Sequence, residues 1–410
     1  MEDRPDSSPE KGQATESAPR GLAPLILRWD LDKTYLATEF ESLRAMMRIP
    51  FEGAEDKRSL PGVRALIRAL QSEARWAGRR VETYFITASP PQIRGPIEEK
   101  LRRDGIQVDD IVYKDQIRAI LRGRFRSLKQ HVGYKLGAML RHRRDRAPAG
   151  ARELLFGDDW EMDPLVYTLY SDLISEEVDR KSVHAILRLL RVGDRRAEEL
   201  LELAEEAKLG EPVVDAILIH RARPGFSASR LVKYGDRLTG TENYLQTAVV
   251  LHNHGYLGER SVATVAESLM EEDDWTPARV QSEIEAVGRT AGAGPMAAAA
   301  LTARLDDLYD ASHASDRSSP VALPPPQPPA TPLHSAPVEL IGLAPPRPHS
   351  APRRLVARWL DRWALRLAER RLGWIDPATL KPSPADYRAI LVDLINGTPE
   401  YELEENDERE

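Results

Sequence analysis

A repeated alternation of short apolar runs with segments of helical periodicity constrains the fold of this chain more than any other feature. The apolar runs, rich in β-branched and aromatic residues, are residues 24–29, 81–86, 108–113 and 153–156. Between them, residues 63–77, 93–101 and 131–142 have apolar positions at helical spacing. Strands that alternate with helices form βαβ units, so we predict an α/β fold with a Rossmann-like, mostly parallel sheet.

The remainder of the chain divides by composition and periodicity. From residue 164 to about 310 the pattern is mostly helical, with one further strand predicted at 213–219. We expect a disordered N-terminus at 1–22, an α/β domain at 23–260 with a helical insertion at about 171–212, a helical extension at 261–310, a proline-rich linker at 311–352, and C-terminal amphipathic helices with an acidic tail at 353–410.

The C-terminal region offers two candidate contact surfaces. The linker contains a PxxP match at Pro325 and Pro328, which is either part of a plain spacer or a contact for a partner protein. Residues 353–372 combine an apolar stripe, including Trp359 and Trp363, with a row of arginines. Such a helix could pack on the rest of the chain, lie peripherally on an anionic membrane, or bind a partner.

Composition excludes several classes of protein. The 410-residue chain has no cysteine, which excludes disulfides, thiolate catalysis and cysteine-ligated metals. Its net charge of −7 argues against general nucleic-acid binding, which needs a concentrated basic surface. It has neither a membrane-spanning apolar run nor an apolar signal segment in residues 1–20. We therefore expect a cytoplasmic protein, with peripheral membrane contact as the alternative.

Two carboxylates follow directly on the first apolar run. Asp30 and Asp32 would lie one above the other if the chain turns after Asp30. Such a pair suits phosphoryl transfer, with Asp30 as the nucleophile and Asp32 as the general acid and base. Thr34 could hydrogen-bond Asp30 or the loop. The alternative is a surface strand end that Asp caps.

A hydroxyl follows the second run in the same way. Thr87 and Ser89 come just after 81–86. Hydroxyl and backbone N–H groups at a helix N-terminus can bind a phosphoryl group. The alternative is ordinary helix capping by either residue.

The run at 153–156 also ends in carboxylates. Gly157 permits a tight turn that would bring Asp158 and Asp159 toward the first pair, and Asp163 follows. A hard divalent cation, most simply Mg²⁺, takes such oxygen ligands. The expected ligands are Asp30, Asp158 and the carbonyl of Asp32. The alternative is an acidic turn between strand and helix.

A lysine is expected to neutralise the phosphoryl oxygens and hold the nucleophile. Lys135 and Lys129 are the two candidates, both near the start of the helix that precedes the fourth strand. We favour Lys135, because it lies nearer the expected strand–helix junction.

The combined pattern resembles that of the haloacid-dehalogenase superfamily of phosphatases. It consists, in chain order, of D-x-D-x-T, a hydroxyl, a lysine and G-D-x-x-x-x-D. The resemblance implies a haloacid-dehalogenase-like fold, a Mg²⁺ cofactor and an aspartyl-phosphate intermediate. The catalytic residues that it implies are Asp30, Asp32, Thr87 and Lys135. The metal-site residues that it implies are Asp30, Asp32 and Asp158, with Asp159 and Asp163 as second-tier acidic residues.

A closer resemblance rests on the tail of the last motif. The pattern Gly157-Asp158, four residues, Asp163-Pro164 and Tyr167 is similar to that of the phosphatidate phosphatase catalytic domain of the actin-patch-protein type. It covers roughly residues 24–260 and implies phosphatidate or a related lipid phosphomonoester as substrate. That family usually has Asp where Lys33 stands and Ser-Gly where residues 159–160 are Asp-Trp, and it lacks the helical residues 171–212.

The spacing between motifs leaves little chain for a capping domain. About 50 residues separate Thr34 from Thr87, and about 45 separate Ser89 from Lys135. A fold without a large cap suits bulky substrates. Two other functions stay open: a phosphatase for a protein or soluble phosphomonoester, and a non-catalytic interaction scaffold.

Overall fold

The computed structural model describes residues 22–37, 59–87, 93–113, 129–160, 162–190, 192–223, 228–290, 303 and 385–390. Six strands form one parallel sheet in the order β3-β2-β1-β4-β5-β6. The strands are β1 (Leu25–Asp30), β2 (Val81–Thr87), β3 (Asp110–Tyr113), β4 (Arg152–Asp158), β5 (Val214–His220) and β6 (Leu238–Thr241). The α/β fold with a parallel sheet is therefore confirmed.

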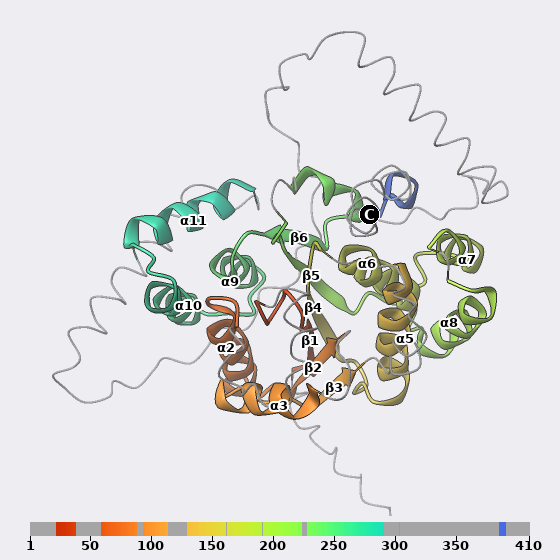
Figure 1. Cartoon of the computed structure of the whole chain (residues 1–410), viewed down its shortest axis with the longest axis horizontal. Helices are drawn as coiled ribbons and strands as arrows, with labels where there is room; N and C mark the ends of the chain where they lie inside the picture. The colour runs from red at the N-terminus through yellow and green to blue at the C-terminus, as the bar shows by residue number, and fades with distance from the viewer. Residues whose placement is uncertain are drawn as a thin grey trace, which may run out of the picture.

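Helices cover both faces of this sheet (Figure 1). One side has α2 (Val63–Trp76), α3 (Arg94–Arg103), α9 (Tyr244–Asn253), α10 (Glu259–Glu272) and α11 (Pro277–Thr290). The other has α5 (Lys129–Asp145), α6 (Asp163–Ile174), α7 (Arg180–Leu189) and α8 (Asp194–Ala207). The result is a three-layer arrangement with the sheet in the middle.

Alternating side chains of the strands supply two large apolar cores, one on each side of the sheet. In β4, Leu154 and Phe156 face the α2–α9–α10 side, whereas Leu155 packs toward α5 and α6. The β5 residues divide in the same way, with Leu218 on the first side and Ile217 on the second. Strands buried on both faces are nearly continuous apolar runs, which is why the sequence reveals most of them.

The second half of the α/β domain contains one more strand than predicted. We expected a single strand after residue 164, but β6 pairs in parallel with β5, with Ile217 opposite Leu238. Its four residues, Leu-Thr-Gly-Thr, lack the apolar run by which the other strands are recognised. They are held in the sheet by pairing with β5. This pairing joins separate segments, so it cannot be predicted from the local sequence pattern.

The predicted insertion at 171–212 forms an outer helical layer. It contains the end of α6 and all of α7 and α8, and α8 packs on α5 and α6. Its buried side chains, including Ile186, Leu200 and Leu201, extend the core that lies under α5 and α6. The insertion thickens one helical layer of the sandwich.

Residues 385–390 pack on this same side, near α6 (Figure 1). The hydroxyl of Tyr387 donates to Asp172 Oδ2 at 2.6 Å, and the backbone N–H of Asp386 donates to the carbonyl of Lys233 at 2.7 Å. The backbone N–H of Ala389 donates to Asp386 Oδ1 at 2.9 Å, which caps the helical turn at 387–390.

The other segments predicted at the chain ends lie outside the described residues. These are the predicted disordered N-terminus, except for Leu22, the proline-rich linker and the helix at 353–372. Within the described part, no helix has the length and apolarity needed to cross a membrane.

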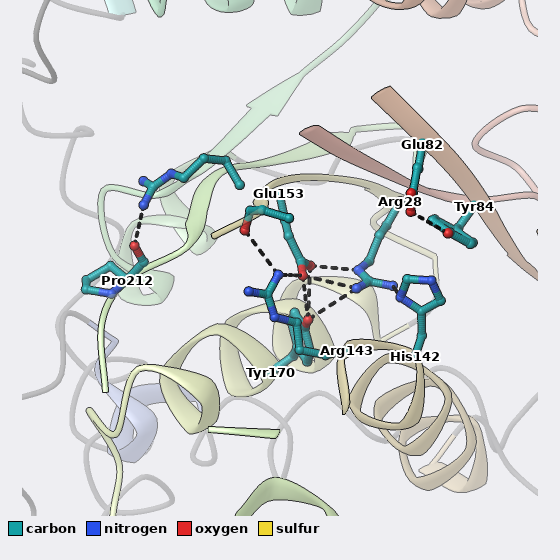
Figure 2. A network of polar contacts seen from close by, with 10 residues as sticks. Arg28, Glu82, Tyr84, His142, Arg143, Glu153, Tyr170 and Pro212 are labelled. Carbon is teal, nitrogen blue, oxygen red and sulfur yellow. Dashed lines mark hydrogen bonds and ion pairs between the residues drawn. The ribbon is translucent and has the colours of Figure 1, made fainter. Parts of the chain in front are cut away.

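A buried polar network joins β1 and β4 to the helices (Figure 2). Arg28 donates to Glu153 Oε2 at 2.7 Å and to His142 Nδ1 at 2.9 Å, and Tyr170 donates to Glu153 at 2.9 Å. Arg143 donates to Glu153 at 2.9 Å. The buried carboxylate of Glu153 is therefore satisfied by two guanidinium groups and a hydroxyl. The same contacts compensate the charge of Arg28, which is why an arginine can lie in this largely apolar strand.

Candidate active site

Four neighbouring strands end on a polar residue at the same edge of the sheet. β2 ends at Thr87, β1 at Asp30, β4 at Asp158 and β5 at His220. Asp158 lies opposite His220 in the strand register, and Asp30 lies opposite Ile86, one residue before Thr87. The parallel topology therefore brings to one place groups that are up to 190 residues apart in the sequence.

The chain turns immediately after Asp30, which is the condition on which the expected pairing of Asp30 with Asp32 depends. The backbone N–H of Leu31 still bonds to the carbonyl of Ile86 at 3.2 Å, and Leu36 then donates back to the carbonyl of Leu31 at 2.9 Å. Within this turn Lys33 has a left-handed φ of 59°. The turn directs Asp32 toward β2, where Oγ1 of Thr87 donates to Asp32 Oδ2 at 2.7 Å.

Lys135 bridges two of the carboxylates. Its Nζ lies 2.7 Å from Asp30 Oδ1 and 2.6 Å from Asp163 Oδ1. All three side chains are at most 2% exposed. Buried carboxylates of this kind need compensation by partners, and the Lys135 ammonium is the partner that Asp30 and Asp163 share.

Asp30, Asp158 and Asp163 form a compact acidic cluster. Each offers one oxygen, and the three oxygens lie within 4.8 Å of one another. Three buried carboxylates around one ammonium leave excess negative charge, which a divalent cation with oxygen ligands would balance. The donor set thus fits Mg²⁺, with these three side chains as the residues that could hold it.

Gly157 has a different role from the one expected. We predicted a tight turn, but Gly157 lies within β4 and pairs with Ile219. A Cβ atom there would lie 2.5 Å from Asp163 Oδ2 and 2.8 Å from Tyr167 Cε2. Glycine is needed because the start of α6 approaches the strand backbone closely, which places Asp163 beside Asp158.

Asp159 does not join the cluster, contrary to the expected inward position. Its Oδ1 accepts hydrogen bonds of 2.9 and 3.0 Å from the backbone N–H groups of Ala222 and Arg223, just after β5. Although these bonds favour the charged form, burial raises the pKa of Asp159 above its ordinary value. Asp159 therefore holds the loop after β5.

The outcomes for the other predicted residues differ. The Asp32 carboxylate contacts Thr87 and is not a member of the acidic cluster, so its carbonyl stays the predicted metal ligand. The buried hydroxyl of Thr34 has no hydrogen-bond partner in the described part of the chain, and the backbone carbonyl of Thr34 accepts from Tyr244. Ser89 lies outside the described residues. Lys129 is the first residue of α5, six residues before Lys135.

An aromatic wall beside the carboxylates was not predicted. The rings of His220 and Tyr244 stack with their centroids 5.1 Å apart. Burial lowers the pKa of His220 to about 4, so the imidazole is neutral at pH 7. Burial also raises the pKa of the Tyr244 hydroxyl, helped by the charges of Asp158 and Asp30. Asp30 and Asp158 were selected because they follow predicted strands. The same criterion, applied to the strand predicted at 213–219, would have found His220.

Tyr134 supports the other side of the site. Its hydroxyl donates to the carbonyl of Val112 at 3.0 Å and lies 3.3 Å from that of Thr87. It therefore joins α5 to the ends of β2 and β3, one residue before Lys135. The arrangement as a whole offers a carboxylate held by a lysine, a second carboxylate held by a hydroxyl, and a buried acidic cluster, which is a set of groups suited to nucleophilic and acid–base chemistry on an anion.

Comparison of the chain with protein-family models, with curated proteins and with solved structures found no significant match.

Proposed function

We propose that this protein is a haloacid-dehalogenase-like, Mg²⁺-dependent phosphomonoester hydrolase that forms an aspartyl-phosphate on Asp30. One observation carries the proposal: Lys135 Nζ contacts both Asp30 and Asp163, and Asp30 also belongs to the acidic cluster with Asp158. A carboxylate between an ammonium and a metal-ligand set is positioned to attack an anionic phosphorus, because the positive charge reduces the repulsion between nucleophile and substrate.

Two half-reactions follow from this arrangement. The carboxylate of Asp30 attacks phosphorus, the ester oxygen leaves, and Asp32 donates a proton to it. Asp32 then removes a proton from water, which attacks the aspartyl-phosphate and releases inorganic phosphate with Asp30 regenerated. Lys135 neutralises the phosphoryl oxygens and orients Asp30. Asp30, Asp158 and Asp163 are the residues that would hold Mg²⁺, which would supply Lewis-acid neutralisation of the phosphate.

Asp32 is well placed to change roles between the two half-reactions. Its Oδ2 accepts from Thr87 Oγ1 at 2.7 Å, and the side chain is buried, so the group is ordered. Asp30 is buried as well, and its carboxylate is held by Lys135. The two carboxylates therefore have different partners, a hydroxyl for the acid–base group and an ammonium for the nucleophile.

The substrate class that we propose is phosphatidate or a related lipid phosphomonoester. It rests on the resemblance of the Gly157–Tyr167 motif and on the short connections that leave little chain for a large cap. The residues between β1 and α2 and those after β2 are in part outside the described chain, so the uncapped site stays a prediction.

The test is Mg²⁺-dependent phosphate release from phosphatidate vesicles and from a soluble aryl phosphate. We expect release by the wild type from both, and none above background by Asp30→Asn. Asp159→Asn is the matched control, since its carboxylate lies outside the acidic cluster and should leave turnover largely intact. Equal release by the wild type and Asp30→Asn would refute the proposed nucleophile, and the ratio of the two wild-type rates ranks lipid against soluble substrates.

A further inference from the structure

Two residues at which this chain departs from the resembling family contact each other. The Nζ atom of Lys33 lies 3.5 Å from the centre of the Trp160 ring, which is a cation–π contact. Lys33 lies in the turn after β1, and Trp160 follows the end of β4. Since β1 and β4 are neighbours in the sheet, the pair joins the two segments that follow Asp30 and Asp158, the last residues of these strands.

The pair lies on the solvent side of the site. The side chains that we assign to chemistry are all at most 5% exposed: Asp30, Asp32, Thr87, Lys135, Asp158 and Asp163. Lys33 and Trp160 are only half-buried, although they are within two residues of Asp32 and Asp158. They are therefore more accessible to a substrate than the carboxylates are, while lying next to those carboxylates in the chain.

Backbone contacts fix both partners. The N–H of Trp160 donates to Asp158 Oδ1 at 2.7 Å, which ties the indole loop to the acidic cluster. The N–H of Lys33 donates to the carbonyl of Leu36 at 2.9 Å, and its left-handed φ of 59° sets the direction of the side chain. Non-glycine residues adopt this backbone conformation rarely, and it often marks functional positions.

The charge of Lys33 is not neutralised by a carboxylate. Within the described residues, no ion pair joins Lys33 to an Asp or Glu, and its ammonium lies over the Trp160 ring. Lys135, by comparison, is held by Asp30 and Asp163. An aromatic face positions an ammonium without cancelling its charge as a carboxylate does, so Lys33 remains able to attract an anion.

We infer that Lys33, positioned by Trp160, is a binding site for a second negative charge adjacent to the scissile phosphate of the substrate. This inference rests on the proposed function and specifies its substrate class. The expected substrates are phosphomonoesters that present a further anionic group close to the phosphate, within reach of the Lys33 side chain. The second charge can belong to the same molecule or to a neighbouring lipid headgroup. Trp160 is then a positioning residue, and Lys33 is the specificity-determining one.

The soluble test compares phenyl phosphate with its ring-carboxylated analogue. We expect the wild type to have a higher kcat/KM for the carboxylated ester, and Lys33→Met to lose roughly tenfold on that ester but little on phenyl phosphate. Lys33→Arg should restore most of the selectivity. Trp160→Phe, which keeps an aromatic face, should retain more selectivity than Trp160→Ala. Arg279→Met removes the similar cation–π contact with Trp275, at 3.9 Å, and serves as the control.

The lipid test separates the two sources of the second charge. Phosphatidate is presented at low mole fraction in phosphatidylcholine vesicles, with or without phosphatidylglycerol. If neighbouring headgroups supply the charge, phosphatidylglycerol should raise the rate for the wild type and not for Lys33→Met. If the substrate itself supplies the second charge, phosphatidylglycerol should have the same effect on both proteins. The wild type and Lys33→Met should then differ only in their preference between the two soluble esters.

Binding of the soluble esters by Asp30→Asn tests this inference without turnover, and so independently of the proposed function. Calorimetric affinities of Asp30→Asn for the two soluble esters with Mg²⁺ are compared with those of Asp30→Asn/Lys33→Met. A Lys33-dependent preference without wild-type turnover would support this inference and overturn the hydrolase proposal. Equal preference with and without Lys33, or no binding of either ester by either protein, would overturn the inference.

Discussion

Oγ1 of Thr87 donates a hydrogen bond of 2.7 Å to Oδ2 of Asp32, and this bond joins the end of β2 to the turn after β1. The donor is fully buried, and a hydrogen bond to an ionised carboxylate is stronger than a bond between neutral groups. It orients Asp32, to which we assign proton transfer in both half-reactions.

Thr87→Val should reduce turnover roughly tenfold, because Asp32 loses the hydrogen bond that orients it. The substitution conserves shape, so the protein should remain folded. Thr83→Val is the control, since Thr83 lies in the same strand and accepts from Gln71 at 2.8 Å, remote from Asp32. Thermal unfolding and kcat are measured for both, and an unchanged kcat for Thr87→Val would show that this bond does not orient the acid.

Mg²⁺ should stabilise the protein against thermal unfolding. At a concentration 100 times its Kd, the gain is about 2.7 kcal/mol for a ligand that binds only the folded state. Asp158→Asn should abolish the gain, because it removes a ligand of the acidic cluster. Asp159→Asn should preserve it, and equal loss in both variants would place the cation elsewhere.

Gly157→Ala should destabilise the protein by about 1–3 kcal/mol, since the added methyl overlaps Asp163 and Tyr167. It should also weaken the Mg²⁺ effect by displacing Asp163 from Lys135. Gly95→Ala on α3 is the control, because a Cβ there meets no atom within 4 Å. Chemical denaturation with and without Mg²⁺ measures both effects. Wild-type Mg²⁺ response in Gly157→Ala would contradict the proposed role of this glycine.

Glu153→Gln should cost about 3–5 kcal/mol, because it leaves Arg28 and Arg143 buried without their common carboxylate (Figure 2). Burial alone would raise the pKa of Glu153, but the ion pair with Arg28 outweighs it and holds the pKa below its ordinary value. Glu99→Gln, at an exposed ion pair on α3, should leave the unfolding midpoint unchanged. Similar midpoints for both variants would contradict the account of the network.

Acid should destabilise the fold partly through His142. Arg28 donates to its Nδ1, and burial, together with the charge of Arg28, lowers the pKa of His142 to about 3. The unfolded chain, with an ordinary pKa of about 6.5, therefore binds the proton more tightly. The contribution is complete above pH about 6.5 and is lost as the pH falls toward 3.

His142→Asn keeps an acceptor but removes the titration. Between pH 6.5 and 4, the slope of unfolding free energy against pH should decrease by up to about 1.4 kcal/mol per unit. Urea titrations at several pH values measure it. A slope identical to that of the wild type would mean that His142 is protonated equally in the folded and unfolded chain.

The sequence predicts the sheet and most of the site because both depend on local patterns. Buried parallel strands are apolar runs, and the groups that follow them meet at one edge whatever the connections between them. This is why the proximity of Asp30, Thr87 and Asp158 could be anticipated. Lys135 could be favoured over Lys129 by the same geometry, and the structure places Lys135 against Asp30 and Asp163.

The features that were missed depend on contacts between distant segments. Strand β6 is short and contains Gly240, so only its pairing with β5 identifies it. Whether Asp158 or Asp159 points inward depends on the loop after β5, whose N–H groups hold Asp159. The ion pair of Arg28 with Glu153 could not be predicted either, because the two residues are 125 positions apart in the sequence.

The most direct test of the account is to identify the residue that receives the phosphoryl group. Asp32→Asn should slow hydrolysis of the intermediate, since the base that activates water is missing. With Mg²⁺ and an aryl phosphate, acid quenching and peptide mass spectrometry should find one phosphoryl group on the peptide containing Asp30, lost on treatment with hydroxylamine and absent in Asp30→Asn. Phosphate release with no phosphorylated peptide, or a phosphoryl group on another residue, would contradict the central claim that Asp30 is the nucleophile.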